Sequence, residues 1–85
     1  MARVYWGDEA DAAIAALPQS VRRAIRARLP YLRRFPELYP LAHEGRYQGC
    51  RHFVVQQRYV VYYKVMGDEQ DCFIRDIRPA RSRPE

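Results

Sequence analysis

The chain has 85 residues, 48% of them hydrophobic, which suffices for one packed domain spanning residues 1–85 and excludes a chain that is disordered throughout. No apolar run approaches the roughly 20 residues of a membrane span, and no apolar signal region follows Met1, so we expect a cytoplasmic protein without membrane contact. The formal net charge is +5, and 14 of the 15 basic residues are arginines; this favours an anionic partner but is equally consistent with a solvated basic surface.

The chain opens with a predicted strand and helix. Residues 2–6 are predicted as a short strand, and the turn Gly7-Asp8 follows it. Asp8 is the expected N-cap of the first helix, because its carboxylate can accept hydrogen bonds from the free amides of the first turn. The apolar face of that helix is formed by Ala10, Ala13, Ile14 and Leu17.

A second helix is predicted after the break at Pro18. Its apolar positions recur at helical spacing, namely Val21, Ile25, Leu29 and Leu32. Pro30 lies inside this segment and has no backbone donor, so we expect it to interrupt the helix between Arg26 and Leu32. Two further prolines then mark a loop, and the tyrosines around it are expected to pack beneath it: Tyr31, Tyr39 and Tyr47. Two helices with a short connection predict a hairpin across one face of a sheet.

Three strand-like runs complete the chain. They cover residues 50–55, 59–65 and 71–77, and all are rich in β-branched and aromatic side chains. Gly67-Asp68 supplies the turn between the last two. The predicted order is therefore β-α-α-β-β-β, and the predicted fold class is α+β, with a two-helix hairpin packed on a curved, mainly antiparallel four-stranded sheet.

Alternation along the strands predicts which side chains face away from the helices. Successive residues of a strand point to opposite faces. If the apolar residues Phe53 and Tyr63 face the helices, then His52, Tyr62 and Lys64 share the open face.

The last strand breaks this alternation. Phe73 and Ile77 fall on the same face as Arg75, which is a poor core residue, so a β-bulge is expected between them. Alternation therefore does not decide which face of the sheet the side chains after Arg75 point to.

The open face combines side chains that suit a nucleic acid. A histidine such as His52 titrates near neutrality and can serve as acid or base. Tyr62 can stack on a base, and Lys64 can bind phosphate together with the arginines of the tail. Those arginines are Arg78, Arg81 and Arg83. An exposed strand histidine beside a packing tyrosine would show the same pattern.

The two cysteines predict neither a disulfide nor a metal site. On the outer strands of a three-stranded meander, Cys50 and Cys72 would be about 9–10 Å apart, too far to bridge. Cys50 and His52 share a face, but a paired ligand spacing and a fourth ligand are missing. We therefore expect no metal and no cofactor.

Four segments carry a family resemblance. They are Arg3–Trp6 with the acidic helix behind it, the arginine-rich helix of residues 17–32, the strand pair of residues 49–55 and 59–63, and the closing motif Ile77–Ser82. In this order they resemble the RelE/ParE superfamily of bacterial toxins from type II toxin–antitoxin systems. The resemblance covers nearly the whole chain, and no single motif in it is diagnostic.

The resemblance implies a growth-inhibiting toxin, first of all a ribosome-dependent mRNA endoribonuclease. In such enzymes, basic and tyrosine side chains promote attack of a ribose 2′-hydroxyl on the adjacent phosphate. Carried over to this chain, the catalytic candidates are His52, Tyr62 and Arg81, and the nucleic-acid-binding candidates are Arg51, Arg58, Lys64, Arg75, Arg78 and Arg83. The implied partners are a cognate antitoxin protein, the ribosome and mRNA, in either a homodimer or a toxin–antitoxin hetero-oligomer.

The chain departs from the family pattern where the chemistry is carried. Val60 stands where the third strand usually has arginine, and Pro79 and Ala80 stand where many members have histidine or arginine. Whether the chain is an enzyme is thus left open. The ParE branch acts on DNA gyrase and does not need these residues, so a non-enzymatic gyrase inhibitor is the alternative. A degenerate member that only binds RNA or antitoxin is the third.

Overall fold

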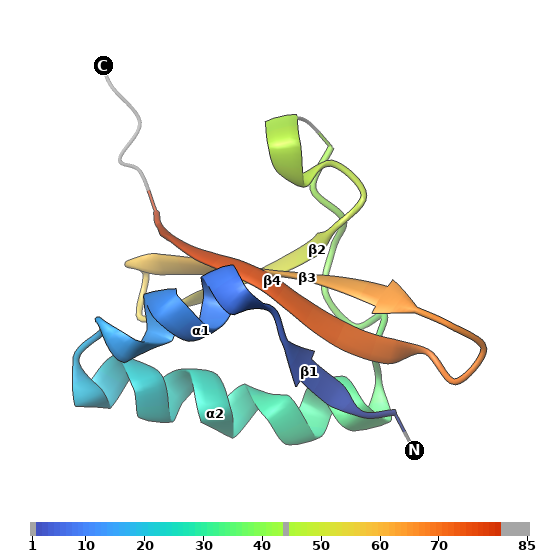
Figure 1. Ribbon diagram of the computed structural model, residues 1–85, viewed down its shortest axis with the longest axis horizontal. Coiled ribbons are helices and arrows are strands. Elements are labelled where there is room, and N and C mark those ends of the chain that lie inside the picture. Colours follow the sequence, from blue (N-terminus) through green and yellow to red (C-terminus); the bar gives the residue numbers. More distant parts are fainter. Residues whose placement is uncertain (1, 44, 81–85) are drawn as a thin grey trace.

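The computed structural model describes residues 2–43 and 45–80 (Figure 1). Its elements are β1 (Val4–Trp6), α1 (Asp8–Ala15), α2 (Gln19–Arg34), the 3-10 helix η1 (Gly45–Tyr47), β2 (Arg51–Val55), β3 (Tyr59–Met66) and β4 (Asp71–Pro79). The predicted order and the α+β fold class are confirmed, and each strand end lies within two residues of its prediction. Among the described residues, no helix has the length and apolar character needed to cross a membrane.

The sheet has the strand order β1-β4-β3-β2. Strands β2, β3 and β4 form an antiparallel meander, whereas β1 pairs with β4 in parallel. The parallel pair is possible because both helices lie between β1 and the rest of the sheet in sequence and provide the long crossover that parallel strands require. The outer edge of β2 is partly covered by the preceding loop, where the amide of His52 donates to the carbonyl of Pro40 at 3.0 Å.

Both helices pack on one face of the sheet, and the core lies between them and the strands (Figure 1). All four predicted apolar residues of α2 are buried, and they meet the inward side chains of the sheet, among them Val61, Tyr63 and Ile74. The Tyr63 hydroxyl donates to the carbonyl of Pro36 at 2.8 Å, and burial raises the pKa of Tyr63 to about 12. In the described part of the chain no α-helix covers the opposite face of the sheet (Figure 1), which is therefore available for a site.

The start of α1 corrects one prediction. Gly7, not Asp8, is the N-cap, and no side chain caps the helix. The amide of Gly7 donates to the carbonyl of Ile74 at 2.9 Å, and a Cβ on Gly7 would come within 2.8 Å of Cζ of Phe73. Close packing of this turn on β4 therefore decides where the helix begins, and Asp8 becomes its first residue, where a carboxylate still favours the helix dipole.

The predicted interruption of α2 at Pro30 is wrong. The helix runs without a break from Gln19 to Arg34 and contains Pro30. Pro30 has no amide hydrogen to donate to the carbonyl of Arg26, four residues earlier. Both residues are solvent-exposed, so water can donate to this carbonyl instead. Burial of the apolar stripe on the other side of α2 outweighs the poor helix propensity of proline.

The predicted bulge in β4 is present. The register with β3 shifts between Tyr62 and Tyr63, because Tyr62 pairs with Asp76 but Tyr63 pairs with Ile74. Arg75 is the extra residue, and its side chain is exposed. The bulge lets Ile74 and Ile77 both face the core and turns Asp76 to the helix-free side, across from Tyr62.

Replacing Pro30 by alanine should raise the free energy of unfolding by about 1–3 kcal/mol, because alanine restores the missing amide and is a better helix former. Urea unfolding measures the change. Pro18→Ala is the matched control, since Pro18 precedes the first turn of α2, where a missing amide has no helical partner to lose. A Pro30→Ala protein that is no more stable than the parent would contradict this account of α2.

Candidate nucleic-acid interface

A row of polar side chains crosses the helix-free face of the sheet. His52 of β2 pairs with Tyr62 of β3, and Tyr62 pairs with Asp76 of β4. Three neighbouring strands thus place one titratable side chain each at the same level. The predicted pairing of His52 and Tyr62 on the open face is confirmed by this register, and Lys64 lies exposed on the same strand face.

A fourth side chain, Tyr47, reaches this row from the loop before β2. Figure 1 shows η1 on the side of the sheet opposite to the helices. The ring of Tyr47 stacks on that of Tyr62 with centroids 4.0 Å apart and an interplanar angle of 9°. Gly45 begins this element and Gly49 follows it, with φ of 77° and 90°, a conformation that glycine adopts without strain. The two glycines let the loop turn back onto the sheet.

Asp76 anchors this arrangement. Its side chain is the one buried charged group in the described part of the chain, with 7% of its surface exposed. Its Oδ2 accepts a short hydrogen bond from the Tyr47 hydroxyl, and its Oδ1 accepts one from the amide of Ile77 at 2.8 Å. Both carboxylate oxygens are therefore satisfied, as a buried carboxylate requires.

Burial and Asp76 together hold the proton on Tyr47. Burial is the larger cause that raises the pKa of the Tyr47 hydroxyl, followed by the hydrogen bond and the charge of Asp76, while Arg46 and Arg78 act in the opposite sense. The guanidinium of Arg46 lies 5.3 Å from the centroid of the Tyr47 ring. At neutral pH, Tyr47 is thus a neutral donor rather than a phenolate.

A hollow of about 400 Å³ opens beside the tyrosine stack. Its walls are Tyr47, Val60, Tyr62, Arg78, Pro79 and Ala80. Two aromatic rings and one guanidinium are groups that bind a nucleobase and a phosphate, respectively. The other three residues are those that replace the basic residues expected from the family resemblance, so one side of the hollow is apolar.

His52 lies next to the hollow but not in its wall. Its ring centroid is 6.2 Å from that of Tyr62, and its Nδ1 is buried and has no hydrogen-bond partner within residues 2–43 and 45–80. A buried imidazole nitrogen usually has a hydrogen-bond partner in the protein. The Nδ1 of His52 makes no such bond to any of the described residues, so it can bind another group.

The predicted basic residues are spread over several places. Lys64 and Arg78 lie on the open face, and Arg58 is exposed in the β2–β3 turn. Arg75 lines a separate depression at the start of α1. Arg51 instead donates to the carbonyl of Tyr39 at 2.8 Å and so holds the loop before β2. Arg81 and Arg83 lie outside the described residues.

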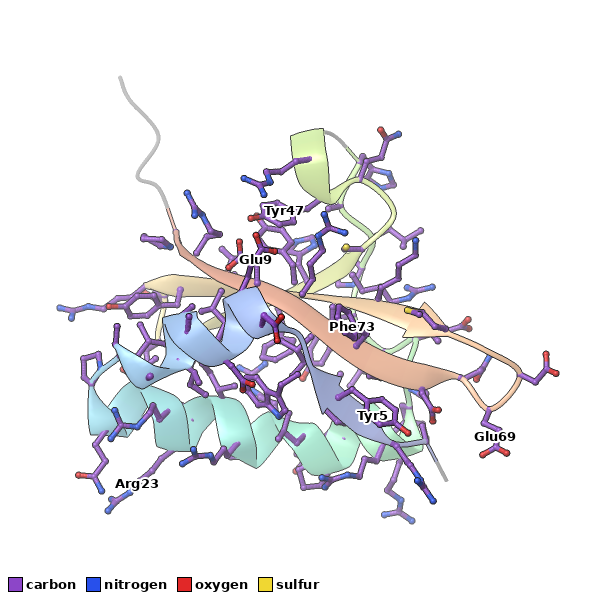
Figure 2. The ribbon with its side chains drawn as sticks, viewed as in Figure 1. Tyr5, Glu9, Arg23, Tyr47, Glu69 and Phe73 are labelled. Atoms are coloured by element: carbon purple, nitrogen blue, oxygen red, sulfur yellow. The ribbon has the colours of Figure 1, made fainter. Side chains whose placement is uncertain are left out.

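The arginines of α2 fall into two groups. Arg28 donates to the Tyr39 hydroxyl and to the Val54 carbonyl, both at 3.2 Å, and therefore ties α2 to β2. Others are exposed, and Arg23 points away from the sheet (Figure 2). Within the described residues, the one ion pair joins Arg46 to Glu9 at 4.0 Å, so these exposed arginines are not neutralised by side chains of the described part.

Tyr47 and Asp76 were not predicted as site residues from the sequence. Tyr47 was expected to pack under its loop, together with Tyr31 and Tyr39; Tyr39 does pack on Phe53, with ring centroids 4.9 Å apart, but Tyr31 is 56% exposed. Asp76 could have been found by carrying the predicted bulge through to its consequence. Tyr47 shows no local signal, because its contacts lie 15 and 29 residues away along the chain.

No group of three or more histidine, cysteine, aspartate or glutamate side chains that could hold a metal occurs among the described residues. Cys50 and Cys72 are both free and buried. Burial raises the pKa of the Cys72 thiol to about 11, so it is protonated at neutral pH.

Solved structures with the same fold come from a bacterial toxin. Neither a protein-family model nor a curated protein sequence matches the chain. A chain of the intact E. coli RelBE toxin–antitoxin complex is similar with a TM-score of 0.79 and 15% identity, over 96% of this chain and 100% of that one. The isolated E. coli RelE toxin is similar with a TM-score of 0.80 and 14% identity, over 98% of this chain and 88% of that one. An E. coli RelE mutant in complex with an antitoxin RelB peptide is similar with a TM-score of 0.78 and 15% identity, over 95% of this chain and 85% of that one. The resemblance to the RelE/ParE superfamily is confirmed at the level of the fold.

Replacing Asp76 by asparagine should lower the pKa of the Tyr47 hydroxyl, because a neutral amide removes the charge and the carboxylate acceptor that hold the proton there. NMR titration of protein labelled at tyrosine Cζ resolves the individual hydroxyls. Asp71→Asn is the control, since Asp71 accepts from the amide of Arg3 at the far end of β4. A Tyr47 pKa unchanged by Asp76→Asn would mean that the pair is not coupled.

Proposed function

We propose that this protein is the toxin of a type II toxin–antitoxin pair and that it cleaves mRNA on the ribosome in the cytoplasm. The observation that carries this is the hollow beside the Tyr47–Tyr62 stack, in which aromatic rings and Arg78 adjoin the buried Asp76 and the unpartnered His52. It lies on the helix-free face of a fold that is similar to that of RelE.

The residues of the open face can supply each element of RNA cleavage. Attack of a ribose 2′-hydroxyl on the adjacent phosphate needs a proton acceptor, a cation on the phosphate and a proton donor for the leaving oxygen. A base packed against the Tyr47–Tyr62 stack would bring the phosphate to Arg78. His52 stands one strand away, and its imidazole is a group that can donate or accept a proton.

Further cations extend the surface beyond the hollow. Lys64 lies two residues beyond Tyr62 along β3, and Arg58 lies at the other end of that strand. The carbonyl of Arg58 accepts a bond from the amide of Ala80 at 2.7 Å, which places the β2–β3 turn beside the rim of the hollow. Arg81 and Arg83 follow directly in sequence. A chain of phosphates passing the hollow would meet Lys64, Arg58 and Arg78, which is the pattern of a single-stranded RNA site.

The partner in this proposal is an acidic antitoxin segment. Positive charge lies on two sides of the molecule, on the open face and on α2. The exposed arginines of α2 that no side chain of the described residues neutralises are Arg23, Arg26, Arg33 and Arg34. The similar RelE structures include complexes with antitoxin. A segment that binds only the folded toxin would also stabilise it.

An inhibitor of DNA gyrase is the second candidate. Val60, Pro79 and Ala80 make one side of the hollow apolar, where the resemblance would place basic side chains of the ribonucleases. An inhibitor that acts by binding alone needs no proton transfer, so this wall does not weigh against it. The two functions differ in the molecule that is damaged in the cell.

Induction of the protein in cells should produce new mRNA 5′ ends inside translated codons, because the proposed enzyme acts on ribosome-bound message. Transcriptome-wide mapping of 5′ ends before and after induction measures this. Co-expression of the protein encoded by the adjacent reading frame should suppress the cuts. Intact mRNA together with accumulating DNA breaks would contradict the ribonuclease and support the gyrase inhibitor.

His52→Ala should lower the rate of mRNA cleavage by about 10²–10⁴-fold, the usual contribution of a general acid–base group. His43→Ala, which removes an exposed histidine of the loop before η1, is the matched control and should leave the rate unchanged. Single-turnover cleavage with purified ribosomes gives both rates. Equal rates for the two variants would exclude His52 from proton transfer.

A further inference from the structure

The hollow contains no side chain that is charged and able to accept a proton. Among its walls, three side chains are aliphatic, and Arg78 stays protonated at all relevant pH values. The buried carboxylate of Asp76 is the nearest anionic group, but it does not line the hollow. Tyr47 connects the two, since this residue lines the hollow and its hydroxyl donates to Asp76.

The Tyr47–Asp76 pair is held in place from several directions. The stack on Tyr62 orients the Tyr47 ring, and the amide of Ile77 fixes the other oxygen of the carboxylate. Arg46, adjacent to Tyr47, lies 4.0 Å from Glu9 at the start of α1, an exposed ion pair that adds little to this support. Figure 2 shows Tyr47 and Glu9 on neighbouring parts of the molecule. Such fixed geometry is what a proton-transfer pair requires.

We propose that Tyr47 is a catalytic residue of the mRNA cleavage proposed above, on which this inference rests, and that Asp76 is its positioning residue and final proton acceptor. The 2′-hydroxyl gives its proton to the Tyr47 oxygen while Tyr47 gives its own to Oδ2 of Asp76. The 2′-oxygen forms a bond to phosphorus, the bond from phosphorus to the 5′-oxygen breaks, and the leaving oxygen takes a proton from the protonated imidazole of His52. Tyr47 ends neutral, Asp76 ends protonated, His52 ends neutral, and the RNA ends in a cyclic phosphate and a 5′-hydroxyl.

The surroundings favour a relay over a free phenolate. The raised pKa keeps Tyr47 protonated, so the hydroxyl can accept a proton only while it passes one on. The charged and titratable groups around it are Asp76 and Arg78 from β4, Tyr62 from β3, His52 from β2, Arg46 from η1 and Glu9 from α1. Of these, Asp76 is the one bonded to the Tyr47 hydroxyl.

The test compares Tyr47→Phe and Asp76→Asn with the parent protein on ribosomes carrying mRNA. Tyr47→Phe keeps the stacked ring and removes only the hydroxyl. Each variant should cleave about 10²–10⁴-fold more slowly, and the double variant should be no slower than the slower single one, because the two residues act as a unit. Binding of mRNA with a 2′-methoxy group at the cleaved nucleotide should stay within twofold of the parent. Tyr31→Phe, which removes an exposed hydroxyl on α2, is the matched control and should cleave normally.

The split between rate and binding separates this role from a structural one. In Tyr47→Phe and Asp76→Asn the cleavage rate at saturating mRNA should fall while binding of the 2′-methoxy mRNA is kept. Tyr47→Phe with a parent-like rate, or a rate loss matched by an equal loss of binding, would overturn the inference. If the parent and Tyr31→Phe also fail to cleave, the proposed ribonuclease function fails, and the relay falls with it.

Discussion

The arrangement of the open face depends on one extra residue in β4. Ile74 and Ile77 both belong to the core, but residues three apart in a regular strand point to opposite faces. Inserting Arg75 as a bulge resolves this conflict. Without it, a strand that kept Ile74 in the core would expose Ile77 and also turn the carboxylate of Asp76 into the helix-covered core, where an unpaired charge costs several kcal/mol. Because Ile74 and Ile77 are both buried in the core, Asp76 lies on the face of the sheet that carries Tyr62.

The buried carboxylate then organises the loop above it. Asp76 is tolerated at 7% exposure because a backbone amide and the Tyr47 hydroxyl satisfy its two oxygens. The same bond recruits η1 to the sheet and completes the wall of the hollow. Stability and the candidate site are therefore coupled at this point: a change that frees Tyr47 leaves a buried acceptor unpaired and also opens the hollow.

Sequence reasoning succeeded where local periodicity decides the structure. The alternation around Tyr63 correctly placed His52 and Tyr62 together, and the conflict between Arg75 and Ile77 correctly indicated a bulge. It failed where distant packing decides. The helix start at Gly7 follows from close contact with β4, and α2 continues through Pro30 because its opposite side is buried. The Tyr47–Asp76 bond joins residues 29 positions apart, for which no spacing rule exists.

The loss of cations from the hollow and the presence of the Tyr47–Asp76 pair are connected by electrostatics. Several arginines around a buried carboxylate would pair with it, hold it ionised and make it a poor proton acceptor. Here the neighbouring wall is Val60, Pro79 and Ala80, and Asp76 forms no ion pair within the described residues. The neutral hydroxyl of Tyr47 is the partner of Asp76 instead, so Asp76 can accept a proton without losing an ion pair. In the proposed mechanism, the apolar wall is therefore what allows a carboxylate to do the work of the missing basic residues, with Arg78 left to hold the phosphate.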